Sequence, residues 1–157
     1  MLTQHDFAVA VEWTGDRGTG TTGYRDFDRG HVIRVDGLPE IQASADRAFH
    51  GDASKHNPEQ LLLAALSGCH MMSYLFHAVR AGIVVTGYED DASAVLAREG
   101  TGGKLVGATL RPRVRLSAGD DATALRIHDD AHRDCFIANS IAFPVTIEPT
   151  VVREEAA

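Results

Sequence analysis

The sequence predicts an α+β fold in which antiparallel sheets pack around one long central helix. Three observations predict it. Several short Val-rich or alternating segments are bounded by Gly, Asp and Pro, and one long apolar segment has helical spacing. Their order along the chain is strands, helix, hairpin, helix, strand, without the regular alternation that builds parallel sheets. The 157 residues suit a single domain, which we expect to cover residues 1–157.

The amino-terminal part predicts two or three antiparallel strands. Residues 7–13 alternate crudely and are rich in Val and Ala, and residues 24–35 and 40–45 follow, with an Asp-Gly turn at 36–37 between the last two. The intervening G-T-G-T-T-G at 18–23 matches the spacing of the dinucleotide-binding fingerprint. That fingerprint requires a helix directly after it, and no helical periodicity follows, so we predict a loop there and no nucleotide site.

Residues 57–80 form the clearest helix pattern. Asn57 suits the N-cap, Pro58 the first helical position, and Gln60 the third residue of a capping box. Gly82 is a suitable stop. Apolar residues cover nearly every face of the first turns, so we expect this helix to be central and buried.

The carboxyl-terminal half predicts a hairpin, a second helix and a last strand. Residues 83–98 and 104–116 are the expected hairpin strands, joined by a Gly-rich turn at 100–103. Residues 120–134 form the expected helix, capped by Asp120 or its neighbour, and residues 143–152 the closing strand.

Composition excludes several classes of function. The net charge is −7 and the 15 Lys and Arg are scattered, so neither nucleic acid nor a membrane is an expected partner. No secretory leader pattern opens the sequence, and no uninterrupted apolar run reaches the roughly 18 residues of a membrane span. We therefore expect a cytoplasmic protein, in which two cysteines are either plain buried thiols or redox-active ones.

Each candidate side chain also has an ordinary structural interpretation. Cys69 and Cys135 are the two cysteines, and either one alone is most simply a buried core residue. His128 and His132 share a helix face and lie near Cys135, which could begin a zinc site, although a solvated helix face is the simpler interpretation. A core or interface role is favoured for His70, which lies seven residues before His77 on the predicted helix.

Three segments together resemble the OsmC/Ohr family of peroxide-resistance proteins. HNPEQLLLAALSGCHMMSYL at 56–75 resembles the family's central helix, in which an Asn-Pro-Glu opening precedes the reactive cysteine by ten residues. DCFIANSIAFPVTIE at 134–148 resembles the second-cysteine segment, and GTTGYRDFDRGHVIRVDG at 20–37 resembles the segment that carries an arginine. The likeness extends over nearly the whole chain.

The resemblance implies a thiol-dependent peroxidase that reduces organic hydroperoxides and, more weakly, hydrogen peroxide. In it Cys69 attacks the peroxide and becomes a sulfenic acid, Cys135 forms a disulfide with Cys69, Arg25 activates the thiolate, and Glu59 holds Arg25. An external dithiol, of the lipoyl or thioredoxin type, restores both thiols, and no metal or other cofactor takes part. Many members have an apolar residue where this chain has His70, and proline where it has Phe136.

Helix geometry adds an argument for a homodimer. Glu59 and Cys69 are ten residues apart, which is about 15 Å along a helix and a different face. A site that contains both side chains then takes Glu59, and with it Arg25, from a second subunit, in agreement with the intertwined homodimers of the family. Apolar side chains expected to line the peroxide site are Leu62, Leu66, Met71, Met72 and Phe143. The alternative is a dimer of the same fold that binds a small apolar ligand without catalysis.

Overall fold

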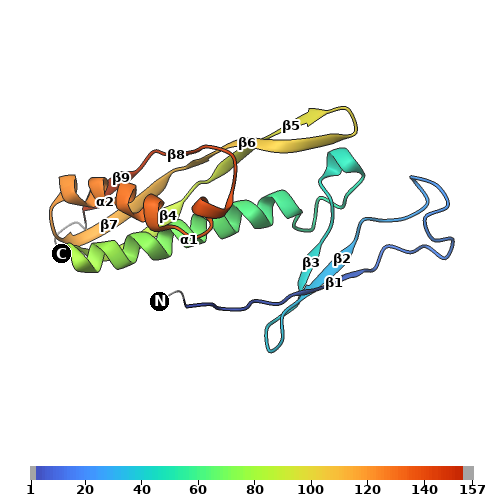
Figure 1. Cartoon of the computed structure of the whole chain (residues 1–157), viewed down its shortest axis with the longest axis horizontal. Helices are drawn as coiled ribbons and strands as arrows, with labels where there is room; N and C mark the ends of the chain where they lie inside the picture. The colour runs from blue at the N-terminus through green and yellow to red at the C-terminus, as the bar shows by residue number, and fades with distance from the viewer. Residues whose placement is uncertain (1–2, 154–157) are drawn as a thin grey trace. The chain divides into compact units, whose positions relative to one another are not determined.

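The computed structural model describes residues 3–153, which form two compact units divided after Leu61. Figure 1 shows the strands β1 to β3 of the first unit and the helices and strands of the second. The predicted α+β class is confirmed, with two α-helices and mixed sheets.

The first unit is a three-stranded antiparallel sheet with a long loop. Its strands are β1 (Ala10–Trp13), β2 (His31–Arg34) and β3 (Ile41–Ala43), in the order β1-β2-β3, and a short 3-10 turn, η1 (Arg47–Phe49), follows. The predicted turn joins β2 to β3, with Gly37 at φ 74°. All three strands are shorter than predicted, and flanking residues such as Asp28 and Ser44 bond instead to the loop residues Gly15 and His56.

The Gly-Thr loop is closed by its own side chains. The Asp16 carboxylate accepts hydrogen bonds from the backbone N–H groups of Gly18 and Gly20, at 2.7 and 2.9 Å. These N–H groups are therefore occupied, and turns rather than a helix follow the loop. The prediction of a loop at 18–23 is confirmed.

Helix α1 (Pro58–Arg80) begins and ends where the sequence predicts. Gln60 N–H donates to the Asn57 side-chain oxygen at 2.8 Å, and Asn57 N–H donates to the Gln60 side-chain oxygen at 3.1 Å, which is a reciprocal capping box. Gly82 follows the helix with φ 68°, a conformation that glycine adopts without steric cost.

The second unit contains two three-stranded sheets. Their orders are β4-β7-β9 and β5-β6-β8, from the strands β4 (Val84–Asp90), β5 (Ser93–Glu99), β6 (Gly102–Leu110), β7 (Pro112–Ala118), β8 (Val145–Ile147) and β9 (Thr150–Arg153). Helix α2 (Asp121–Asp134) and the 3-10 turn η2 (Ala138–Ser140) lie between β7 and β8 in the chain. Asp120 caps α2, as predicted, by accepting from Thr123 N–H at 2.8 Å.

The strand predictions were wrong in two respects. Each of the three long strands expected in this half is split in two, because the chain passes from one sheet to the other at residues 91–92, 111 and 148–149. The Asp90 carboxylate stabilises one crossing by accepting Arg111 N–H at 2.7 Å. In addition, β8 pairs with β6 and β9 with β7 in parallel, so neither sheet is purely antiparallel.

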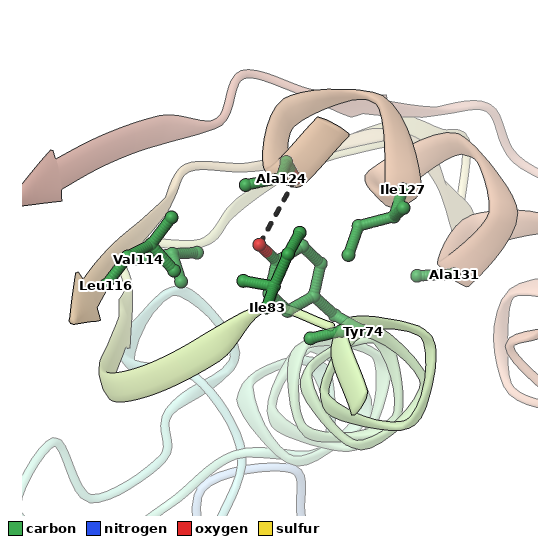
Figure 2. Close-up of a cluster of buried hydrophobic side chains, with 8 residues drawn as sticks. Tyr74, Ile83, Val114, Leu116, Ala124, Ile127 and Ala131 are labelled. Carbon is green, nitrogen blue, oxygen red and sulfur yellow. Dashed lines mark hydrogen bonds between the residues drawn. The ribbon is translucent and has the colours of Figure 1, made fainter. Parts of the chain in front are cut away.

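The core of this unit lies between α1, α2 and the sheet. Every fourth residue of α1 from 66 to 78 is buried, and the Tyr74 hydroxyl donates to the carbonyl of Ala124, in the first turn of α2, at 3.2 Å. Figure 2 shows Tyr74 directed from α1 toward α2, beside Ile83, Val114 and Leu116. Tyr74 thus links the two helices by both packing and a hydrogen bond.

The opposite face of α1 is exposed in the single chain, which corrects the expectation of an all-round buried helix. Met72 is 63% exposed, Phe76 58% and Val79 78%. With Leu62, Ala65 and Cys69 these residues repeat at alternating steps of three and four, the spacing of a helix–helix contact stripe. We call residues 62, 65, 69, 72, 76 and 79 the α1 stripe.

Helix α1 also has the length and mean hydropathy of a membrane span. Its apolar sequence is interrupted by Ser67, His70, Ser73 and His77. Ser67 donates to the Asp90 carboxylate of β4 at 2.5 Å, and His70 is buried against α2. Through these polar contacts α1 is bonded to both β4 and α2.

Candidate functional site

The structure brings the two cysteines together. Cys69 lies half-buried in the middle of α1, and Cys135 is buried directly after α2. Both pack in a cluster with Leu66, Ala108 and Leu110. Burial, and to a smaller extent the neighbouring Cys69 thiol, raises the pKa of Cys135 to about 11. The two thiols therefore lie in one packed cluster, although they are 66 residues apart in the sequence.

The turn after α2 holds Cys135 from several sides. Ala138 N–H donates to the Cys135 sulfur at 3.4 Å, which favours negative charge on that sulfur. Asn139 donates to the Cys135 carbonyl twice, from its backbone N–H and from its side-chain amide, both at 3.0 Å. Hydrogen bonds to its sulfur and its carbonyl thus hold Cys135 in place. Cys69, in contrast, faces an open pocket.

The pocket beside Cys69 has a volume of about 660 Å³. Its walls are mainly apolar and come from Cys69, Met72, Ser73, Phe76, Asp134, Phe136 and Asn139. Of the apolar lining residues expected from the sequence, the structure places Met72 here. Leu62 and Phe143 line a different pocket, next to β6, and Leu66 is buried in the core.

Phe76 and Phe136 were missed by the sequence reasoning. Phe76 lies seven residues after Cys69 and therefore on the same helix face, a signal that the helical spacing contained. Phe136 follows Cys135 and is 82% exposed, and its place at the mouth of the pocket depends on the turn at η2. The Asp134 carboxylate also lines this pocket, and it forms a hydrogen bond with His77 Nε2 at 2.9 Å.

Arg25 and Glu59 both lie in the first unit. Arg25 is exposed in a turn, and its carbonyl accepts from Arg17 at 3.2 Å. Glu59 is half-buried in the first turn of α1. Within residues 3–153 no ion pair joins Arg25 to Glu59. A single chain therefore does not show the contact by which, according to the resemblance, Glu59 holds Arg25. Their roles stay predictions.

Arg29, which the sequence reasoning overlooked, is the more firmly held arginine of this loop. Its guanidinium lies over the rings of Tyr24 and Phe27, at 4.5 and 4.2 Å from their centroids. It also donates to the backbone carbonyls of these two residues, at 2.6 Å each. The available signal was an arginine that follows two aromatic residues closely, two and five positions after them, in the segment YRDFDR.

The zinc hypothesis has no geometric support. His128 points into the core, where its Nδ1 meets His70 Nε2 at 3.0 Å, so this nitrogen is taken up by another histidine. In the described part of the chain, no three His, Cys, Asp or Glu side chains are placed to hold a metal ion.

With this geometry in place, residues 51–150 match the OsmC-like protein family. This chain belongs to the OsmC-like family. Its fold is similar to an OsmC-like protein of unknown function from Vibrio cholerae, with a TM-score of 0.84 and 28% identity over 94% of this chain and 100% of that one. None of the curated proteins matches this chain.

Two more distant OsmC-like structures share the fold. An organic hydroperoxide resistance protein OsmC from Legionella pneumophila has a TM-score of 0.68 and 20% identity over 94% of this chain and 98% of that one. An organic hydroperoxide resistance protein from Elizabethkingia anophelis has a TM-score of 0.64 and 17% identity over 97% of this chain and 100% of that one.

Proposed function

We propose that this OsmC-like protein is a thiol-dependent peroxidase that reduces organic hydroperoxides. The observation that carries the proposal is the placement of the two cysteines: Cys69 opens on an apolar pocket, and Cys135 is buried in the cluster against which Cys69 packs. Membership of the family and the names of two structural relatives support the same activity.

The reaction follows from the positions of the two sulfurs. The Cys69 thiolate attacks the O–O bond, an S–O bond forms, and the departing alkoxide takes up a proton and leaves as an alcohol. The Cys135 sulfur then attacks the Cys69 sulfenic acid, and the hydroxyl leaves with the Cys135 proton as water. The resulting disulfide protects Cys69 from further oxidation.

The disulfide must be reduced for a second turnover. An external dithiol supplies two electrons and two protons by thiol–disulfide exchange, and we propose a lipoyl-type or thioredoxin-type reductant in the cytoplasm. The exposed position of Phe136 and Asn139 around the sulfurs leaves room for a dithiol to approach. The steps require no metal or other cofactor.

The pocket lining favours organic over inorganic peroxide. Met72, Phe76 and Phe136 offer apolar surface to an alkyl or aryl group, and burial of that surface contributes binding free energy that hydrogen peroxide lacks. We therefore propose that organic hydroperoxides react faster than hydrogen peroxide.

We also propose that the active form is a homodimer. The exposed α1 stripe places Met72, Phe76 and Val79 in water in the single chain, and the same stripe of a second copy would cover the part that lies outside the pocket at Cys69. The partner then supplies Arg25 and Glu59, since ten residues of continuous helix separate Glu59 from Cys69.

A single-turnover experiment tests the peroxidase. The reduced protein receives one equivalent of cumene hydroperoxide, and free thiols are counted by mass spectrometry. We expect rapid loss of both thiols with a Cys69–Cys135 disulfide, and no disulfide in the Cys69→Ser variant. Two intact thiols after minutes in excess peroxide would refute the proposal.

One observation favours a second candidate, a dimer that binds a small apolar ligand. The pocket of about 660 Å³ is large and apolar enough for a drug-sized molecule, whether or not Cys69 reacts. The Cys69→Ser variant separates the two functions, because a binding protein keeps its ligand after this change and a peroxidase loses turnover.

A further inference from the structure

A buried pair of histidines joins the two helices that carry the cysteines. His70 Nε2 and His128 Nδ1 are 3.0 Å apart, and the two rings stack with centroids 5.3 Å apart and planes 14° from parallel. The residues are 0% and 2% exposed, and the Tyr74 ring stacks on His128 at 4.1 Å. The pair is thus a directional link between α1 and α2, inside the core.

This link leaves polar atoms without a partner. A neutral imidazole has one N–H and one lone pair, so one ring of the pair donates and the other accepts. His70 Nδ1 and His128 Nε2 are then buried with no hydrogen bond within residues 3–153. An unpaired buried polar group lowers the stability of the fold, whereas two apolar residues of similar shape avoid that cost. General core stability therefore does not account for the pair.

Both rings are neutral at physiological pH. Burial lowers the pKa of His70 to about 4 and that of His128 to about 3. The bond between them is therefore an ordinary neutral hydrogen bond. This hydrogen bond is directional: it joins one ring atom of α1 to one ring atom of α2. Apolar contacts are not directional and allow the helices to slide past each other.

The same two helices position the sulfurs. His70 directly follows Cys69 on α1, and His128 lies two turns before Cys135 on α2. A disulfide forms only within a narrow range of Cβ–Cβ distances, roughly 3.5–4.5 Å. A slide or rotation of α1 against α2 by about 1 Å, a sizeable part of that range, therefore changes how readily the two sulfurs bond.

We propose that His70 and His128 are positioning residues, whose mutual hydrogen bond sets the register of α1 against α2 and holds Cys69 and Cys135 at the separation from which their disulfide forms. The inference deepens the proposed function, on which its role in turnover rests. It concerns the stability of the disulfide, which can be measured without any peroxide.

The test is the reduction potential of the Cys69–Cys135 disulfide in glutathione buffers. Two glutathione thiols give two electrons and two protons to the protein disulfide and leave as glutathione disulfide, and mass spectrometry gives the ratio of the protein forms. The matched variants are His128→Asn and His128→Gln. Both carry an amide, but only asparagine places it where Nδ1 of the imidazole lies, whereas glutamine extends it by one methylene.

We expect His128→Asn to keep the potential of the unchanged protein. His128→Gln, and the double variant His70→Leu/His128→Leu, should favour the dithiol about tenfold more, which raises the potential by about 30 mV for this two-electron couple. Far-ultraviolet circular dichroism checks the fold of each variant. Equal potentials for the unchanged protein, His128→Asn and His128→Gln would overturn the inference, even if the double variant fails to fold.

The outcomes separate this inference from the proposed function. A potential that shifts as expected in a protein inert toward cumene hydroperoxide supports the positioning pair and refutes the peroxidase. A peroxidase with unchanged potentials in all variants refutes only the positioning pair. Failure of the unchanged protein to form a Cys69–Cys135 disulfide in oxidised glutathione refutes both.

Discussion

At the scale of single residues, the environments of the two thiols differ. Cys69 opens on the pocket, whereas Cys135 is fully buried and its pKa is raised to about 11. A buried thiol with a high pKa is a poor nucleophile toward free peroxide and is also protected from it. The division of labour implied by the family resemblance, with Cys69 attacking and Cys135 resolving, therefore agrees with burial.

Phe136 offers a test of substrate preference. The change Phe136→Ala removes apolar surface at the mouth of the pocket, and we expect kcat/KM for cumene hydroperoxide to fall by about tenfold. The rate with hydrogen peroxide should stay nearly unchanged, as should the free energy of unfolding, since Phe136 is 82% exposed. Steady-state assays with both peroxides check this, and an equal loss with both would contradict it.

The buried histidines make stability depend on pH. Their folded pKa values of about 4 and about 3 lie below the ordinary value of 6.5, so the folded state disfavours their protonation. The stability that the two neutral rings contribute is therefore fully present above pH 6.5. As pH decreases from 6.5 toward 4, the free energy of unfolding falls by up to about 1.4 kcal/mol per pH unit for each ring.

Urea unfolding between pH 7.5 and 4.5 measures this slope. Carboxylates titrate mainly at the lower end of the range, and the His70→Leu/His128→Leu variant serves as the control, in which we expect a shallower slope between pH 6.5 and 5. If the free energy of unfolding changed equally with pH in the two proteins, the folded state would not disfavour protonation of the histidine pair.

At the scale of elements, the capping box fixes where α1 starts. The Asn57→Ala change removes the side-chain acceptor for Gln60 N–H, and we expect a loss of about 1 kcal/mol in the free energy of unfolding. Thermal or urea unfolding measures it, and Gln42→Ala on β3 is a control outside any cap. A loss no greater than that of the control would contradict the role of the cap.

At the scale of the whole molecule, the α1 stripe is the feature that a single chain leaves unexplained. Val79 belongs to the stripe but does not line the pocket at Cys69, so a change there tests assembly apart from chemistry. We expect Val79→Glu to convert a dimer into a monomer in sedimentation, because a charge in an apolar helix contact is costly to bury. Peroxidase activity should be lost with it, since the partner's Arg25 and Glu59 leave the site.

The control is Arg126→Glu, on the exposed face of α2, which should stay dimeric and active. A Val79→Glu monomer with full activity would show that one chain holds a complete site. An unchanged protein that sediments as a monomer would refute the homodimer directly.

Local chemistry made several features predictable from the sequence. The capping box at Asn57 and the stop at Gly82 depend on residues within a few positions of each other, and both ends of α1 are confirmed. The Asp36-Gly37 turn and the Asp120 cap are local in the same way. The roles predicted for both cysteines come from the family resemblance, because no local pattern contains them.

Only the tertiary structure decided the rest, because it depends on contacts between distant residues. The split of each long strand and the parallel pairing of β8 and β9 arise where the chain changes sheets, and no local pattern contains that information. Cys69 and Cys135 join one cluster across 66 residues of sequence, and the bond of His70 with His128 spans 58. By itself the sequence determined the ends of the helices, while the packing of α1 against α2 determined which side chains meet; the roles of the two thiols stay predictions.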